Sequence, residues 1–241
     1  MFQKRRIESL VAGLLALVLI APACASVNKS INIGDNVETD GQSTVNGSIS
    51  VGSGSTVSGS LHTVNGTIRV AENTRLRDVE TVNGSIRIDS GSSADDIESV
   101  NGSISLAENV TVEGGIEVVN GKITLGKGTT VADDVENVNG EMELSGADIG
   151  GDILTVNGDI SLVEGTVLHG NLKVSKPGGW SWNNDKDRRK PRIVIGPGAR
   201  VMGNIELERA VELFISESAE VGGVSGEMGM DDAVRFSGNH P

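Results

Sequence analysis

A tripeptide, Val-Asn-Gly, recurs seven times along the chain and constrains the fold more than any other feature. Consecutive copies stand 18 or 19 residues apart, with their valines at Val45, Val64, Val82, Val100, Val119, Val138 and Val156. A fixed period of this length is typical of repeat architectures, in which each unit buries its apolar side chains against its neighbours. We therefore expect a stack of similar units and not a globule around one irregular core.

Each repeat also carries apolar residues at fixed distances from its valine. With that valine as position one, positions five and seven are apolar around a polar residue, which is the alternation of a β-strand with one inward face. Two more apolar positions follow near thirteen and seventeen, so five inward aliphatic residues are expected in each repeat. The repeat that begins at Val100 shows this with Ile104, Leu106, Val112 and Ile116.

Two all-β architectures could use this pattern. Asn-Gly between apolar segments favours a hairpin, but an antiparallel meander needs a turn roughly every 8–12 residues. Here Asn-Gly comes once in 18 or 19 residues. A coil of three short strands, each pairing in parallel with its copy in the next coil, fits better. The predicted fold class is all-β: a single-stranded parallel β-helix (solenoid) of about ten coils of 18–19 residues.

The pattern extends beyond the seven copies of the motif. Val27 and Asn28 keep the phase 18 residues before Val45, and aliphatic residues continue the spacing as far as Val224. At ~4.8 Å per coil, the rod would be roughly 50 Å long. Residues 26–224 are expected to form the β-helix. The remaining residues, 225–241, lack the period and form either a cap over the last coil or a disordered tail.

Residues 1–25 have the order of a secretory signal peptide: a basic start, an apolar run of 11 residues and then small residues. The apolar run is shorter than the roughly 20 residues that span a membrane. Cleavage after Ala25 would leave a soluble chain without cysteine. Alternatively, Cys24 becomes the first mature residue and carries a lipid. We expect a periplasmic or secreted protein, with an outer-membrane lipoprotein as the alternative.

Charge and side-chain chemistry exclude several function classes. The formal charge is −13, and removal of residues 1–25 leaves −15, which disfavours nucleic acid and anionic lipid as partners. The sequence has three histidines, no Gly-x-Ser-x-Gly elbow and no phosphate-binding glycine motif. Two acidic pairs, Asp95–Asp96 and Asp133–Asp134, could imitate the paired acids of glycosidases, but solvated corners explain them as well. We expect no enzyme, no metal and no cofactor.

The asparagines of the motif are expected to stack above one another. Identical amides can hydrogen-bond along a ladder, Asn tolerates a left-handed backbone, and the glycine that follows relieves the corner sterically. The alternative is a row of amides that binds a ligand. The predicted ladder consists of Asn46, Asn65, Asn83, Asn101, Asn120, Asn139 and Asn157.

One segment, residues 176–191, interrupts the period and is bracketed by prolines. It holds both tryptophans of the chain and a basic cluster. Insertions in solenoids often form the binding face, and aromatic residues beside cations suit a polysaccharide or a partner protein. The alternative is a flexible loop whose indole rings fold back onto the rod. The candidate binding residues are Trp180, Trp182, Lys186, Arg188 and Arg189.

The stacked coils, together with the phrase Ile-Gly-Pro-Gly-Ala-Arg-Val-Met-Gly-Asn-Ile at residues 195–205, resemble the bactofilin family of polymer-forming bacterial proteins. That resemblance covers roughly residues 27–224. It implies a right-handed β-helix of triangular cross-section that assembles end to end without nucleotide. The Val-Asn-Gly-x-Ile repeats also resemble a group of bacterial adhesin-type β-solenoid domains. Bactofilins are typically cytoplasmic, whereas this chain has an export signal, so a cytoskeletal role does not fit.

The sequence therefore predicts an exported, non-enzymatic, structural, self-associating or adhesin-like β-solenoid of the bacterial cell envelope. Its expected partner is a second copy or an envelope polysaccharide or protein. The alternative is a carbohydrate-binding module, or an inactive polysaccharide-active β-helix, that uses the loop of Trp180 and Trp182.

Overall fold

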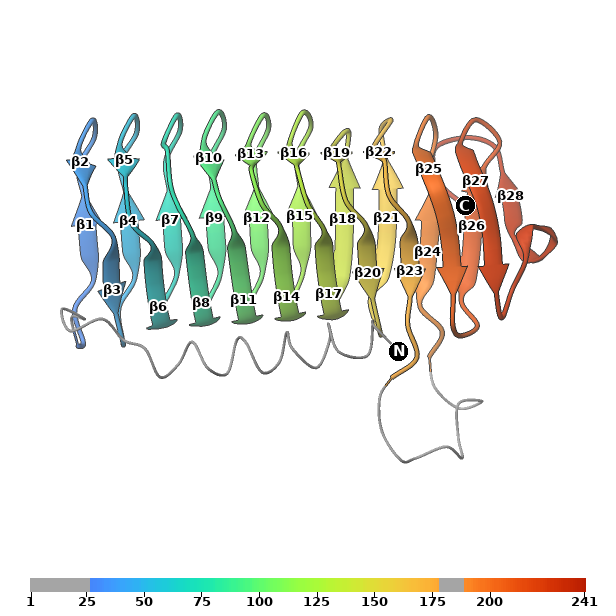
Figure 1. Ribbon diagram of the computed structural model, residues 1–241, viewed down its shortest axis with the longest axis horizontal. Coiled ribbons are helices and arrows are strands. Elements are labelled where there is room, and N and C mark those ends of the chain that lie inside the picture. The colour runs from blue at the N-terminus through green and yellow to red at the C-terminus, as the bar shows by residue number, and fades with distance from the viewer. Residues whose placement is uncertain (1–26, 178–188) are drawn as a thin grey trace.

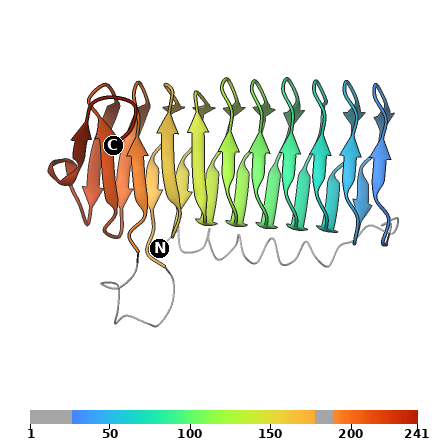
Figure 2. The same cartoon turned by 180° about the vertical axis from the view of Figure 1, so that it is seen from behind.

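The computed structural model describes residues 27–177 and 189–241, and these form one elongated parallel β-solenoid (Figure 1). Short strands stack side by side from β1 at one end to β28 at the other, as the view from behind also shows (Figure 2). Each strand of a regular coil pairs in parallel with its copies in the adjacent coils, so that Ile104 lies between Ile86 and Ile123. The predicted fold class, an all-β parallel solenoid of about ten coils, is confirmed.

Three faces run along the rod. Face 1 follows the Val-Asn-Gly corner and consists of β1 (Ile31–Ile33), β4 (Ile49–Val51), β7 (Ile68–Val70), β9 (Ile86–Ile88), β12 (Ile104–Leu106), β15 (Ile123–Leu125), β18 (Glu141–Ser145), β21 (Asp159–Val163), β24 (Arg192–Ile195), β26 (Glu212–Ser216) and β28 (Val234–Phe236). Face 2 has two-residue strands, namely β2 (Glu38–Thr39), β5 (Thr56–Val57), β10 (Ser93–Ala94), β13 (Thr111–Val112), β16 (Thr130–Val131), β19 (Asp148–Ile149) and β22 (Val167–Leu168). A single bridge residue, Arg75, joins β5 to β10.

Face 3 leads into the Val-Asn-Gly corner. It consists of β3 (Gln42–Thr44), β6 (Leu61–Asn65), β8 (Val79–Asn83), β11 (Ile97–Asn101), β14 (Ile116–Asn120), β17 (Val135–Asn139), β20 (Ile153–Thr155) and β23 (Leu172–Val174). Two longer strands, β25 (Arg200–Leu207) and β27 (Glu220–Gly226), continue both faces 2 and 3. Both strands are continuous through the corner that separates these faces in the regular coils, and their register shifts there between Val201 and Asn204.

The core is a column of stacked aliphatic layers, as the positions five, seven, thirteen and seventeen predict. In the coil that begins at Val100, the side chains of Ile104, Leu106, Val112 and Ile116 are at most 2% exposed. Burial of such a side chain contributes about 2 kcal/mol. A single coil covers its own layer only from the sides, so this burial is complete only when coils stack above and below.

The motif valine does not point inward, contrary to the expectation. Val100 is half-buried, whereas Ser99 before it is fully buried. The inward residue here is usually polar because it satisfies the carbonyl of the corner glycine in the previous coil. Thr63 Oγ1 donates to Gly47 O at 2.8 Å, and a buried Asn side chain takes the same role in β17. A second inward position, just before face 2, is also polar in most coils, and Thr129 Oγ1 there donates to Ala107 O at 2.9 Å. Each regular layer therefore has four aliphatic positions and two further inward positions that are usually hydrogen-bonding.

The two ends of the rod differ. Residues 225–241 include the 3₁₀ helix η2 (Met230–Asp232) and β28, which pairs with β26. Met228, Met230 and Ala233 pack against the core, and Phe236 is 9% exposed, so this segment caps the last coil. At the other end β1, β2 and β3 are the outermost strands of their faces among the described residues.

Candidate functional site

The amides of the motif asparagines form one continuous ladder at the corner between faces 3 and 1. Each Nδ2 donates to the Oδ1 of the rung one coil nearer the N-terminus, at 2.6–3.1 Å. All seven predicted members take part, and Asn28 adds an eighth: the rungs are Asn28, Asn46, Asn65, Asn83, Asn101, Asn120, Asn139 and Asn157. Because the Nδ2 and the Oδ1 of each inner amide are both hydrogen-bonded to neighbouring rungs, the ladder has a structural role.

Backbone conformation is not the reason for asparagine in the motif. Of the eight rungs only Asn28 has a positive φ, 61°. Asparagine serves the left-handed backbone elsewhere, at Asn36, Asn73 and Asn109 in the turns between faces 1 and 2. The glycine of the motif has the predicted steric role, since a Cβ on Gly102 would lie 1.6 Å from the carbonyl oxygen of Gly84.

The ladder ends where the insertion leaves the solenoid. The register of β20 and β23 aligns Lys176 with Asn157, so the next rung is missing. Arg209, one coil further along the same column, is 3% exposed and reaches back across the gap. Its Nη1 donates to Asn157 Oδ1 at 2.8 Å and to Val156 O at 3.2 Å. One buried guanidinium therefore terminates the amide ladder.

The same region fixes the base of the insertion. Arg209 Nη2 donates to Arg189 O at 3.4 Å, and the Asp159 carboxylate accepts from Arg189 Nη2 and from the backbone N–H of Arg192. On the other strand of the base, Lys176 Nζ pairs with Glu227 at 2.9 Å. The hydrogen bond to Asp159 raises the pKa of Arg189. Arg189 is thus an anchor of the loop base.

The other four members of the predicted binding site lie outside the described residues, and so do the predicted signal peptide and its Cys24. The binding hypothesis for the insertion therefore stays a prediction, and so does the choice between a soluble and a lipidated chain. The predicted residues in question are Trp180, Trp182, Lys186 and Arg188.

The paired aspartates join one coil to the next. Asp96 Oδ1 accepts from the backbone N–H of Gly115 at 2.8 Å, and Asp134 Oδ1 accepts from that of Asp152 at 2.7 Å. Asp95 pairs with Arg77 at 2.9 Å. These contacts use three of the four carboxylates structurally. In the described ranges no group of three or more His, Cys, Asp or Glu side chains could hold a metal ion.

A column of glutamates runs along the outside of face 3, and the sequence interpretation missed it. Glu80, Glu98, Glu117 and Glu136 stand in register on successive strands, with His62 Nδ1 at 3.3 Å from Glu80 at one end. Burial, and then the charges of Glu117, Glu80, Asp96 and Asp78, raise the pKa of Glu98 to about 7. The sequence pattern that marks this column is Glu-x-Val-Asn-Gly, which occurs four times.

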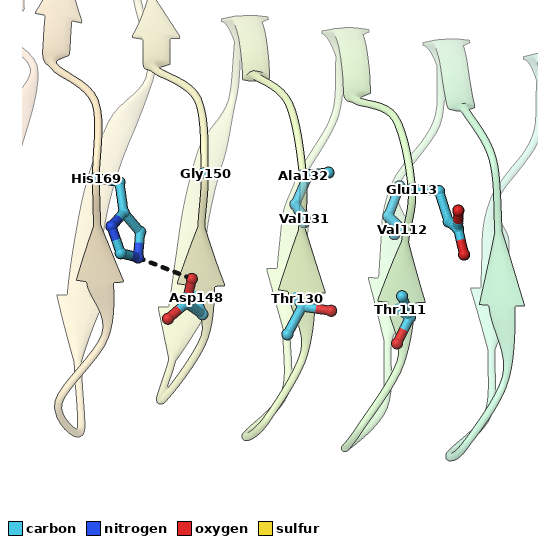
Figure 3. A pocket seen from close by; sticks show the side chains of 9 residues that line it. All are labelled: Thr111, Val112, Glu113, Thr130, Val131, Ala132, Asp148, Gly150 and His169. Carbon is cyan, nitrogen blue, oxygen red and sulfur yellow. Dashed lines mark hydrogen bonds and ion pairs between the residues drawn. The ribbon is translucent and has the colours of Figure 1, made fainter.

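Face 2 carries a shallow depression of about 550 Å³ (Figure 3). Two rows of residues line it: Thr111, Thr130 and Asp148 in one, and Glu113, Ala132, Gly150 and His169 in the other. His169 Nε2 lies 3.1 Å from Asp148 Oδ1, and both side chains are about half exposed. We call this feature the Ala132 groove. No sequence motif marks it, because it arises where small residues replace large ones.

The comparisons with known proteins add no relative: no family model, curated protein or solved structure matches this chain. Within the part of the chain that the structure describes, no helix is long and apolar enough to cross a membrane.

Proposed function

We propose that this protein is an exported, non-enzymatic structural rod of the cell envelope that self-associates through its N-terminal end. The observation that carries the proposal is the contrast between the two ends. The C-terminal end is closed by η2 and β28, whereas on the N-terminal side three strand edges have no described strand beside them. The predicted bactofilin-like and adhesin-like resemblances agree with such a role.

The outer edge of β1 offers backbone groups to a further strand. Ile31 N–H donates to Ser48 O at 2.8 Å, and Ile33 O accepts from Gly52 N–H at 2.9 Å. Because backbone groups alternate in direction along a strand, Asn32 between them directs its N–H and C=O away from β4. An open edge of this kind is a template for pairing with another chain.

Apolar side chains accompany the open edges. Val27 is 64% exposed and Val37 is 38% exposed, and Ile31 is only partly buried against the core. Two of the four large exposed hydrophobic residues in the described part of the chain therefore belong to the first coil. Contact with a second copy would cover these side chains and satisfy the edge at the same time.

The proposal also accounts for the polar side chains of the rod. The asparagines of the ladder, the inward threonines and serines, and the corner aspartates hold one coil on the next. A catalytic site needs a nucleophile, base or acid aimed at a substrate. The ladder amides, inward hydroxyls and corner aspartates instead hydrogen-bond to groups of adjacent coils, which supports a structural role.

Sedimentation velocity over a concentration series tests the proposal. We expect growth of the sedimentation coefficient with concentration, and negative-stain images of paired or longer rods. Asn32→Pro removes the outward N–H and is tolerated on the free side of an edge strand, so it should shift association to at least tenfold higher concentration. Asn32→Ser is the matched control, because Ser50 occupies the same row in β4. A rod that stays monomeric at all concentrations would refute self-association.

A further inference from the structure

The Ala132 groove exists because of a change in residue size along one outward row of face 2. Arg77, Asp95 and Glu113 occupy the row directly before the groove, and His169 and Met202 occupy it afterwards. Between them stand Ala132 and Gly150, both exposed. At ~4.8 Å per coil, Glu113 and His169 are roughly 14 Å apart along the axis, with a floor of small residues between them.

Several polar groups of the groove are available to a ligand. Within the described residues no hydrogen bond or ion pair engages the carboxylate of Glu113 or the hydroxyls of Thr111 and Thr130. Asp148 uses Oδ1 to hold His169 Nε2. The view in Figure 3 shows the Thr111, Thr130 and Asp148 side chains in a row along the axis, one on each successive coil. Acceptors and donors therefore recur once per coil beside the small-residue floor.

These features indicate which ligand chemistry fits the groove. Two carboxylates against one imidazole make the groove acidic, in keeping with the acidic chain, so a cationic ligand is favoured. Hydroxyl and carboxylate groups on one side of a small apolar floor suit a ligand that has hydroxyls at its edge and an apolar face. Their recurrence along the axis suits a linear polymer whose units are about as long as the distance between coils.

We propose that the Ala132 groove binds a linear oligosaccharide with free amino groups, with Glu113 as the partner of one ammonium group. This site is separate from the N-terminal edges on which the proposed self-association rests. A basic peptide would meet the same charge, but extended peptides bind sheets chiefly through open edges. The strands of the groove pair with neighbours on both sides, β13 with β10 and β16, and β16 with β19, so no such edge is offered there.

Titration calorimetry of the purified protein with a β-1,4-linked glucosamine tetramer at low salt tests the proposal. We expect saturable binding that Glu113→Gln weakens about tenfold, as loss of one charge-assisted hydrogen bond predicts. Ala132→Arg should abolish binding by filling the floor. The row already carries Arg77, so this substitution should leave the melting temperature unchanged. Asp89→Asn, at an exposed position near the end of face 1, is the matched charge control and should bind as the parent does.

Three results would overturn the inference. One is the absence of saturable binding at millimolar tetramer. Another is equal binding of the N-acetylated tetramer, because the ammonium group would then contribute nothing. The third is equal or tighter binding of tetralysine that Ala132→Arg also abolishes, which would assign the groove to a basic peptide. Each of these leaves the sedimentation behaviour, and with it the proposed self-association, unaffected.

Discussion

In the regular coils, residues 27–174, each structural requirement is met by the same or similar residues repeated in register. In residues 189–241 the same requirements are met by single residues. The regular corner has a glycine in each coil from Gly47 to Gly158 and an amide on every rung. In the C-terminal part a single guanidinium, that of Arg209, ends the ladder, and a segment that occurs once, with Met228, Met230 and Phe236, caps the last coil.

The difference shows what a solenoid needs besides its repeat. A repeated contact has a copy on either side, so its geometry is determined by the stack itself. An end has no such copy, and the chain must supply a different residue for each exposed group. We therefore expect substitutions in the repeat to act through collisions between coils, and substitutions near the C-terminus to act through loss of individual contacts.

The largest effect is expected for Gly102→Ala. The new Cβ would fall 1.6 Å from Gly84 O and 2.5 Å from its carbonyl carbon, so two coils must separate at the corner. We expect a loss of about 3 kcal/mol in the free energy of unfolding, measured by urea titration. Gly229→Ala in the C-terminal cap is the matched control, with its nearest atom at 4.0 Å and an ordinary φ of −113°. Equal losses in both variants would contradict the distinction between repeat and cap.

A smaller effect is expected for Arg209→Met, which keeps the apolar stem of the side chain but removes the guanidinium. The ladder carbonyl of Asn157 and the backbone carbonyls of Val156 and Arg189 would lose a buried donor. We expect a loss of about 2 kcal/mol, read from the same urea titration. In the middle of the ladder, Asn101→Ala should cost about 1 kcal/mol because its partners are solvent-exposed. A larger loss for Asn101→Ala would contradict this ranking.

The parts of the fold that repeat were predictable from sequence, and the parts that occur once were not. Period-two alternation around Ile104 and Leu106 identified a strand of face 1, and the motif spacing predicted both the parallel register and the Asn ladder. The inward residue before the motif valine was missed because Thr, Ser and Asn are polar there. Their inward direction follows from the carbonyl of the previous corner, which only the folded stack brings near.

Side-chain sites were less predictable for the same reason. Arg209 stands 52 residues from Asn157 in sequence and meets it only because the insertion removes a rung. The Ala132 groove depends on which residues are small in consecutive coils, a property that is visible only after the coils are aligned in register. The role of the acidic pairs likewise became clear only from contacts between coils, since Asp96 accepts a hydrogen bond from a backbone N–H one coil away.

The smallest expected effect concerns Glu98 and the pH dependence of the regular stack. Its pKa is raised from 4.5 to about 7 by burial and by Glu117 and Glu80 on the adjacent strands. A carboxyl group whose pKa is higher in the folded state than in the unfolded state destabilises the fold when it ionises. The stability that the fold keeps while Glu98 is protonated is therefore fully present below pH ~4.5. It declines between pH ~4.5 and ~7 and is lost above pH ~7, where the group is ionised.

Glu98→Gln removes this titration while keeping the shape of the side chain. We expect the variant to be more stable than the parent by about 1 kcal/mol at pH 8, less than the full pKa difference implies because solvent partly screens the group. At pH 4.5 that gain should vanish, and urea titrations at both pH values measure the change. Glu72→Gln, at an exposed turn position outside the column, controls for the altered net charge. An equal gain at pH 8 in both variants would mean that net charge, and not the stacking of carboxylates, lowers the stability of the parent. Among the described residues of the C-terminal part there is no comparable column of carboxylates.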